Sequence, residues 1–348
     1  MPKVSICIPN LNNRPFLPER FETIFKQTFE DWELIVYDSY SDDGAWEYIQ
    51  ELAAHEPRMR ISQGPREGTP GSWNPCIRQA RGEYVYIATS DDTMSPDFLE
   101  KMVAALDQNP DCGVAHCCLD FIDEYGVKIL SGHCWGNWFT TRFFGDWNKK
   151  HHVRPRGHDA IVILVSLKTV YLSVTQILIR RSLFDKVGLF KNKWGSIGDM
   201  EWQMRAALAT RTVHVPEYLA TWRVHPQQAS QIELCHKAIR NGWFFEMADE
   251  VIKFSHANNL PFKGGLPRRL RNYFWDEYIN ARLSLEKKRL RKLSVLLAMW
   301  RSDPTLIMPS LQNRFRARFL KRNMDAEQEV RKELSRLGVE VLLPAKQA

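Results

Sequence analysis

The sequence predicts an α/β fold in which a mainly parallel sheet is flanked by helices and followed by a helical region. Over residues 4–118, short apolar runs alternate with segments of helical periodicity. This alternation is typical of βαβ units, in which a helix connects two parallel strands. A helical pattern dominates beyond about residue 230. We therefore predict an α/β domain over residues 1–230 and a basic helical C-terminal region over residues 231–348.

The N-terminus contains the first predicted βαβ unit. Residues 4–9 (VSICIP) form a continuous apolar run that ends at a proline, as expected of a strand buried on both faces. Residues 16–28 carry apolar side chains at helical spacing, and residues 32–37 (WELIVY) form a second apolar run. The pattern predicts a strand, a helix and a second, parallel strand.

The same alternation continues along the chain. The next predicted elements are a helix over 42–55, a strand near 59–62, a helix near 74–80, a strand over 84–88, a helix over 96–109 and a strand over 113–118. Residues 119–174 are less regular and rich in aromatic residues and histidine, so we expect loops there rather than sheet. Regular structure is expected to resume over residues 176–181.

Composition is that of an ordinary globular protein, with 44% hydrophobic and 26% charged residues in 348. The N-terminus lacks the features of a signal peptide, and the longest apolar stretches fall far short of the roughly 20 residues that cross a bilayer. Seven cysteines without a repeating spacing suit a reducing compartment. We therefore expect a cytoplasmic protein with free thiols.

One group of residues raises the alternative of a zinc site. It consists of Cys112, His116, Cys117, Cys118, His133 and Cys134. No CxxC pair is present to anchor a metal. Buried strand cysteines are the favoured interpretation.

Mostly polar residues lie at or just after the ends of four successive predicted strands. They are Pro9, Asn10 and Asn12 after the first, Asp38 after the second, residues 63–68 after the third, and Thr89, Ser90, Asp91 and Asp92 after the fourth. A single residue of this kind can be a helix cap or a turn former. Ligands of such sheets bind beyond the carboxyl ends of the strands. Four strand ends in agreement therefore predict a ligand site.

Five motifs resemble, in order, those of the family 2 glycosyltransferases and span residues 3–228. They are VSICIPNLNN, IVYDSYSDDG, RQARGEYVYIATSDD with a following proline, ILIRRSLFDKVGLF, and GDMEW with a downstream RVH. The resemblance implies a GT-A fold and an inverting transfer from a nucleotide-diphosphate sugar, with a UDP-sugar favoured. It also implies a glycan or lipid-linked acceptor in bacterial surface polysaccharide synthesis.

The resemblance further implies a bound Mn²⁺ or Mg²⁺ that neutralises the diphosphate leaving group. The family holds this ion through a DxD motif, where this chain has Thr89-Ser90-Asp91. The first carboxylate is missing, so Asp91 is the predicted ligand. His225 in RVH matches a position that faces the metal or the diphosphate. A surface loop residue is the alternative interpretation of His225.

Other residues are assigned to the donor in the same way. Asp38 matches the acidic residue that holds the base or the ribose of the nucleotide. The full set of predicted donor-binding residues is Pro9, Asn10, Asn12, Asp38, Arg66, Asn74, Thr89, Ser90 and Asp91.

Asp199 is the predicted catalytic base, because inversion needs a carboxylate within hydrogen-bond reach of the acceptor hydroxyl. Alignment of GDMEWQMR to the family pattern on Arg205 places Asp199 on the catalytic aspartate. Glu201 is a competing base, and a purely structural role as a helix N-cap is open for Asp199. Trp202 is predicted either to stack on an acceptor sugar or to lie in the core.

Two other functions stay open at this point. A nucleotidyltransferase would also bind nucleotide and metal at strand ends, although no glycine-rich basic loop follows the first strand to hold a triphosphate. A degenerate protein that binds a sugar nucleotide or nucleic acid without catalysis would fit the missing DxD carboxylate and the basic C-terminal third.

The C-terminal third carries an excess of basic residues. Residues 263–321 hold 15 Lys and Arg against 4 Asp and Glu, with leucines at helical spacing among them. Amphipathic basic helices of this kind bind anionic lipid, whereas a solvated helix face is the alternative. No base-stacking platform of aromatic residues is evident, so nucleic acid is not a predicted partner. We predict peripheral attachment to the inner face of the cell membrane through residues 263–321.

Overall fold

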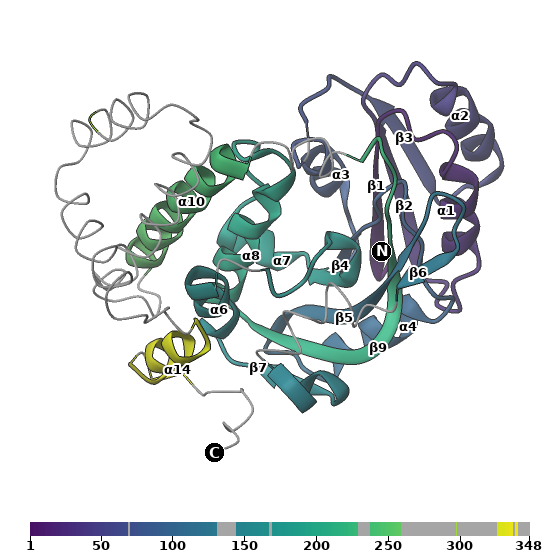
Figure 1. Ribbon diagram of the computed structural model, residues 1–348. Helices are drawn as coiled ribbons and strands as arrows, with labels where there is room; N and C mark the ends of the chain where they lie inside the picture. The colour runs from purple at the N-terminus through teal and green to yellow at the C-terminus, as the bar shows by residue number, and fades with distance from the viewer. Residues whose placement is uncertain are drawn as a thin grey trace.

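The computed structural model describes residues 1–68, 70–130, 144–166, 169–228, 237–258, 297, 326–336 and 338–339. A nine-stranded sheet lies at its centre, with the order β3-β2-β1-β4-β8-β5-β9-β7 and with β6 paired to β5 (Figure 1). The strands are β1 (Val4–Asn10), β2 (Trp32–Asp38), β3 (Met59–Gln63), β4 (Tyr84–Ile87), β5 (Cys112–Ile122), β6 (Lys128–Leu130), β7 (His152–Arg154), β8 (Ile177–Arg180) and β9 (Arg211–Arg223).

The N-terminal half of the sheet is parallel, as predicted from the βαβ pattern. β1 pairs in parallel with both β2 and β4, and β2 pairs in parallel with β3. β8 then runs antiparallel to β4 and to β5, after which β5 and β9 are parallel. The carboxyl ends of β1, β2 and β4 therefore open at one edge of the sheet.

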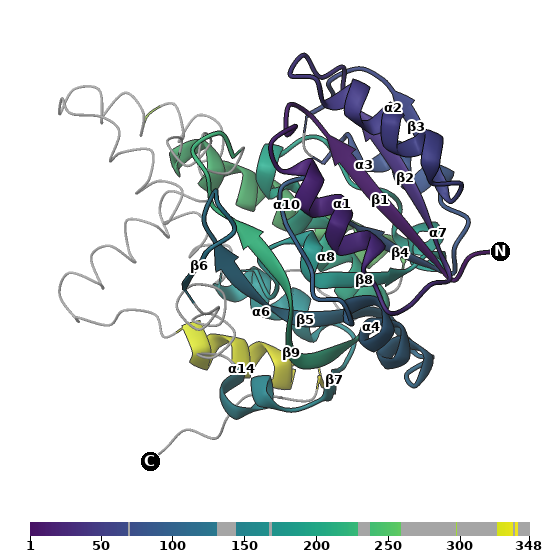
Figure 2. The ribbon, with the colours of Figure 1, turned by 90° about the vertical axis from the view of Figure 1, so that its right-hand side faces the viewer.

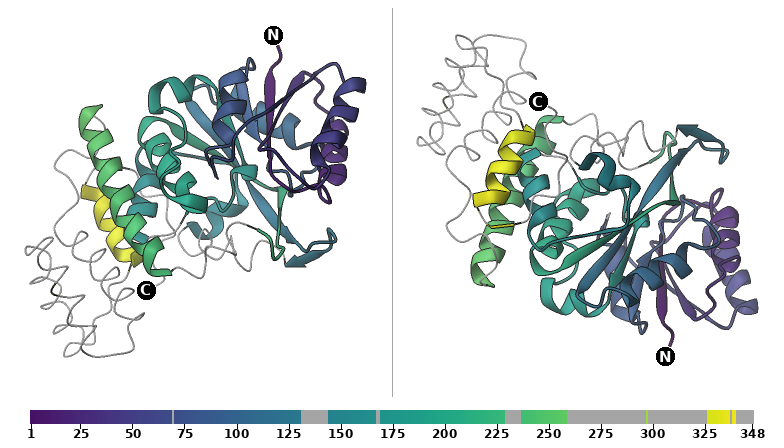
Figure 3. Two further views of the ribbon diagram at one scale, coloured as in Figure 1. Left: turned by 90° about the horizontal axis from the view of Figure 1, so that it is seen from above. Right: turned by 90° about the horizontal axis from the view of Figure 1, so that it is seen from below.

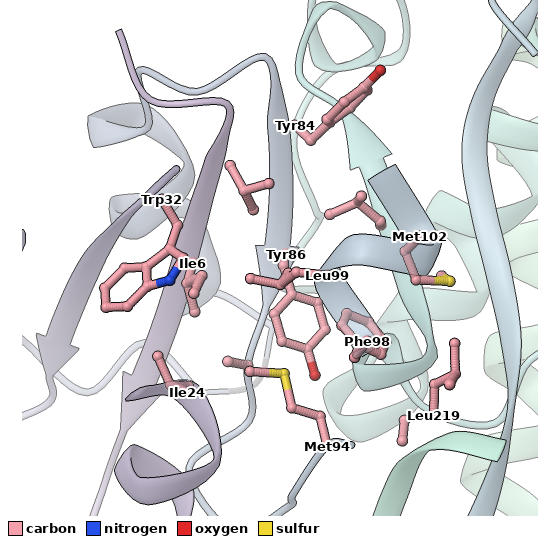
Figure 4. Close-up of a cluster of buried hydrophobic side chains, with 14 of the residues drawn as sticks. Ile6, Ile24, Trp32, Tyr84, Tyr86, Met94, Phe98, Leu99, Met102 and Leu219 are labelled. Carbon is pink, nitrogen blue, oxygen red and sulfur yellow. The ribbon is translucent and has the colours of Figure 1, made fainter. Parts of the chain in front are cut away.

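Helices cover both faces of this sheet. One face carries α1 (Leu17–Phe25), α2 (Ala45–His55) and α4 (Phe98–Asp107), and Figure 2 views the molecule from the side of α1 and α2. The other face carries α3 (Trp73–Gln79), α7 (Ser182–Val187) and α8 (Gly198–Ala209). Successive strand residues point to opposite faces, so Ile6 packs in the first layer and Cys7 in the second. Figure 4 shows Ile6, Tyr86, Phe98 and other side chains of the first layer.

A third hydrophobic cluster joins C-terminal helices to the α/β part. It contains side chains of α6 (His158–Ser166), α8, α10 (Lys237–Ala257) and α14 (Ala326–Arg336), among them Met247, Val251, Val330 and Leu334. Figure 3 shows α10 and α14 on the same side of the molecule, away from the N-terminal strands. The boundary at residue 230 stays a prediction, but α10 and α14 are not isolated from the sheet domain.

The expectation of loops over residues 119–174 is wrong for much of that stretch. β5 continues to Ile122, and β6, β7 and α6 also fall within it. Two of these strands pair with a distant partner: β7 pairs with β9, and Phe121 in β5 pairs with Trp222. Local periodicity carries no signal of such pairing, which explains the error.

Cys7, Cys76, Cys112, Cys117 and Cys118 are buried free thiols, as expected, whereas His133 and Cys134 of the zinc alternative lie outside the described residues. Within the described parts of the chain, no helix combines the length and the apolar character needed to cross a bilayer. The segment predicted to bind membranes, residues 263–321, lies outside the described residues except for Leu297. Its membrane attachment therefore stays a prediction.

Candidate active site

A cleft of about 290 Å³ lies beyond the carboxyl ends of β1, β2 and β4. Its wall combines residues that are far apart in the sequence. They include Pro9, Asn10, Asn13, Ser39, Arg66, Thr89, Ser90, Asp91, Asp92, Ser173, Asp199, Trp222 and His225. The strand ends predicted to form a ligand site do meet there.

The two predicted metal ligands are in contact. His225 lies two residues after the end of β9, and its Nε2 is 3.2 Å from Oδ2 of Asp91. The His225 side chain is 4% exposed and that of Asp91 is 16% exposed, so the pair forms part of the cleft wall rather than an outer loop. The surface-loop interpretation of His225 is therefore wrong.

Thr89, which stands in place of the first DxD carboxylate, forms a hydrogen bond within its own loop. The Thr89 hydroxyl donates to the Asp92 carboxylate, whose other oxygen accepts the backbone N–H of Arg223 at 2.8 Å. Burial, and then the charge of Asp91, raise the pKa of Asp92 to about 8. Asp92 therefore braces the loop, and Asp91 is the carboxylate left to bind a ligand in the cleft.

Asp199 also lines the cleft. It is the second residue of α8, and its Oδ2 accepts a hydrogen bond of 3.3 Å from Nε2 of Gln203. The N-cap position belongs to Ile197, so Asp199 is not the cap of this helix. Burial raises the pKa of Asp199 to about 7. A carboxyl of this kind suits proton abstraction near neutral pH.

Glu201 points away from the cleft. Both of its oxygens accept hydrogen bonds of 2.7 Å from Arg205, and Lys191 lies 3.1 Å away. The Glu201 side chain is 0% exposed and is not part of the cleft wall. Arg205 in turn donates to the carbonyl oxygens of Val187 and Leu189. Glu201 therefore has a structural partner, which counts against its role as the base.

We expect Glu201→Ala to lower the free energy of unfolding by about 3–5 kcal/mol, because the substitution leaves the buried Arg205 charge without its carboxylate. Chemical denaturation with a fluorescence readout measures this change. A loss under about 1 kcal/mol would contradict the structural role, since that is the range of an exposed ion pair.

Trp202 belongs to the core. Its ring stacks on Phe190 with centroids 4.8 Å apart, and its indole N–H donates to the Gly188 carbonyl at 3.0 Å. The side chain is fully buried. The alternative in which Trp202 stacks on an acceptor sugar is therefore wrong.

The structure divides the predicted donor-binding residues into two groups. Pro9, Asn10, Arg66, Thr89, Ser90 and Asp91 line the cleft. Asn12, Asp38 and Asn74 do not. Asn12 exchanges hydrogen bonds with Asp42, and Asn74 exchanges hydrogen bonds with the backbone of Phe190.

Asp38 is occupied by protein donors. Its carboxylate accepts hydrogen bonds from Asn10 at 2.8 Å, from Ser41 at 2.6 and 2.9 Å, and from Gln63 at 3.0 Å. Asp38 is fully buried. In this structure it orients Asn10, and Asn10 is the residue of the pair that lines the cleft.

Several cleft residues are absent from the sequence-based prediction. Asn13 donates to the Ser90 hydroxyl at 2.7 Å and so connects the loop after β1 to the loop after β4. Asn13 is the last residue of the motif VSICIPNLNN, so its position was a usable signal. Ser173 and Trp222 come from segments whose place beside the cleft depends on the β8 and β9 pairings.

Sequence comparison shows that this chain is similar to known glycosyltransferases. The putative glycosyltransferase EpsE of Bacillus subtilis is 33% identical over 129 residues, which are 36% of this chain and 46% of EpsE. The GalNAc(5)-diNAcBac-PP-undecaprenol beta-1,3-glucosyltransferase of Campylobacter jejuni is 31% identical over 118 residues, 33% of this chain and 37% of that protein. Each match spans less than half of the relative's length.

Solved structures agree on the fold. Residues 1–349 of S. aureus TarS in complex with UDP-GlcNAc give a TM-score of 0.58 at 16% identity, covering 85% of this chain and 79% of that one. The mannosyltransferase PcManGT of Pyrobaculum calidifontis, solved with GDP-Man and Mn²⁺, gives 0.51 at 16% identity, covering 92% and 88%. These likenesses confirm the GT-A type of α/β fold. Residues 5–188, more than half of the chain, match the family model described as glycosyl transferase family 2, and the chain belongs to that family.

Proposed function

We propose that this chain is an inverting glycosyltransferase that moves a sugar from a nucleotide-diphosphate sugar, with a UDP-sugar favoured, to a glycan or lipid-linked acceptor. The observation that carries the proposal is one cleft that holds both the Asp91–His225 pair and the buried carboxyl of Asp199. The pair can face a diphosphate while Asp199 faces an acceptor. Bacterial surface polysaccharide synthesis is the pathway class that the family resemblance of the motifs implies.

The Asp91–His225 pair suits a divalent cation. A carboxylate oxygen and an imidazole nitrogen converge within 3.2 Å, and both are metal-ligating atoms. Among the residues that the structure describes, no three His, Cys, Asp or Glu side chains are grouped to hold an ion unaided. Donor phosphate and water oxygens would therefore complete the coordination. An imidazole suits Mg²⁺ poorly, so we favour Mn²⁺ of the two predicted ions.

The bound ion would supply positive charge beside the departing diphosphate. Asp199 removes the proton of the acceptor hydroxyl while the hydroxyl oxygen bonds to the anomeric carbon. The bond from that carbon to the diphosphate oxygen breaks on the opposite face, and the nucleoside diphosphate leaves with the electron pair. Attack and departure on opposite faces invert the configuration.

A thermal-shift screen tests the donor. UDP-, GDP- and dTDP-sugars are each added with and without Mn²⁺, and the true donor is expected to raise the melting temperature most in the presence of Mn²⁺, because ligands that bind the native state stabilise it. Binding at 100 times the dissociation constant contributes about 2.7 kcal/mol.

The screen also separates the alternatives. Stabilisation without any transfer or hydrolysis in mass spectrometry would favour a degenerate binding protein. A sugar nucleotide among the products, in place of a glycoside, would favour a nucleotidyltransferase. No stabilisation by any donor would contradict the proposal.

A further inference from the structure

Arg223, at the end of β9, contacts the loop that carries Asp91 from two directions. Its Nε donates to the Asp91 carbonyl at 2.6 Å, and its backbone N–H donates to the Asp92 carboxylate at 2.8 Å. Its Nη1 donates to the Asp123 carbonyl at 2.9 Å and to the Glu124 carbonyl at 3.3 Å. The side chain is 1% exposed. Arg223 therefore joins the Asp91 loop to the turn after β5.

Arg223 also connects to His225 through an aromatic ring. The guanidinium carbon lies 5.1 Å from the centroid of Phe16, just before α1. The same ring packs against the imidazole of His225 with centroids 4.7 Å apart. Both predicted metal ligands thus depend on Arg223, Asp91 through a hydrogen bond and His225 through the chain and the Phe16 ring.

Glu19 in α1 supplies the opposite charge. Its Oε2 lies 2.6 Å from Nη2 of Arg223, and the Glu19 side chain is 46% exposed. A buried guanidinium is costly without a carboxylate partner, so Glu19 holds Arg223 in this position. Because Glu19 is exposed at the surface, its carboxylate can be changed without opening the core.

We propose that Arg223 is a positioning residue that keeps Asp91 and His225 at metal-binding distance, and that Glu19 fixes Arg223. The inference rests on the proposed function. This positioning matters because Thr89 stands in place of the first DxD carboxylate, which leaves two protein ligands for the metal ion. The affinity for the ion then depends more strongly on how well Asp91 and His225 are oriented.

The test is UDP binding measured by calorimetry over a range of Mn²⁺ concentrations, with UDP binding in EDTA as a second readout. Arg223→Lys is expected to raise the Mn²⁺ concentration at half-saturation by about 10-fold to 100-fold, the usual effect of losing a residue that orients metal ligands. UDP affinity in EDTA should stay unchanged. Glu19→Gln should give a smaller rise of the same sign, because a neutral hydrogen bond replaces a charge-assisted one.

Glu22→Gln is the matched control. Glu22 lies on the same helix and pairs with Lys26 in an exposed ion pair. It should leave the Mn²⁺ requirement unchanged.

The outcomes separate this inference from the function on which it rests. A wild-type chain without Mn²⁺-dependent UDP binding would overturn the uridine donor and the metal together. Normal wild-type binding with an unchanged Mn²⁺ requirement in Arg223→Lys would overturn the positioning role alone. If Arg223→Lys does not fold, Glu19→Gln decides: an Mn²⁺ requirement equal to that of Glu22→Gln rejects the proposal.

Discussion

Asp199→Asn is expected to lower the rate of sugar transfer by about 100-fold to 10,000-fold, the usual effect of losing a general base. The amide has nearly the size of the carboxyl, so the α8 backbone and the affinity for the donor should change little. Initial rates at saturating donor, together with the dissociation constant of UDP, measure the two effects separately. An equal loss of rate and of UDP affinity would point to a donor-binding role for Asp199.

The raised pKa of Asp199 adds a pH signature to this prediction. A base must be ionised, so kcat/KM of the wild type should rise with pH through about 7, where the Asp199 carboxyl loses its proton. The residual activity of Asp199→Asn should lack this rise. A wild-type profile that is flat from pH 5 to pH 8 would contradict the assignment.

The pH dependence of the free energy of unfolding tests the raised pKa of Asp199 without the need for an acceptor. Burial raises the folded-state pKa of Asp199 from 3.8 to about 7, so the ionised form is disfavoured in the folded chain. The unfolded chain releases this proton at lower pH, and the contribution of Asp199 to the free energy of unfolding therefore falls as pH rises from about 4 to 7. Asparagine cannot ionise. Asp199→Asn should stabilise the chain relative to the wild type more at pH 8 than at pH 5.

Glu201→Gln is the comparison that decides between the two carboxylates. It removes the charge that faces Arg205, so we expect lower stability with kcat retained in the molecules that stay folded. Rates should be compared at a temperature where both variants are fully folded. An inactive Glu201→Gln beside an active Asp199→Asn would show that the base is misassigned.

The sequence predicts helices and strands correctly where they depend on residues that are close together in the chain. β1, α1 and β2 follow from short apolar runs and helical spacing, and parallel pairing brings the ends of these strands to one edge. Pro9, Asn10 and Asp91 stand at or just after strand ends in the sequence, and all three line the cleft.

The sequence does not predict the role of a residue where that role depends on the direction of its side chain or on pairing between distant strands. Asp38 stands at the expected strand end, yet its oxygens face Asn10 and Ser41. Glu201 and Asp199 are two residues apart on one helix, and their opposite directions became clear only from the Arg205 contact. The importance of Arg223 depends on the register of β9 against β5, which no local pattern encodes.

Asp91→Ala is expected to abolish detectable transfer and to remove the Mn²⁺ dependence of UDP binding. Asp91 is the acidic side chain of its loop that remains available, because the oxygens of Asp92 are bonded to Thr89 and to the Arg223 backbone. Without Asp91, His225 would be left as a single neutral ligand, which holds Mn²⁺ weakly. Calorimetric titration of UDP with Mn²⁺ and with EDTA measures the loss directly.

Asp92→Asn is the matched control for this prediction. It changes the neighbouring carboxyl to an amide of the same size, which can keep the contacts with Thr89 and with the Arg223 backbone. We expect it to retain Mn²⁺-dependent UDP binding close to that of the wild type. If both variants lose the Mn²⁺ dependence, the integrity of the loop rather than ligation by Asp91 is what the ion requires. Unchanged Mn²⁺-dependent binding in Asp91→Ala would show that the ion is held elsewhere, and the pairing of Asp91 with His225 would then be a structural contact of the cleft wall.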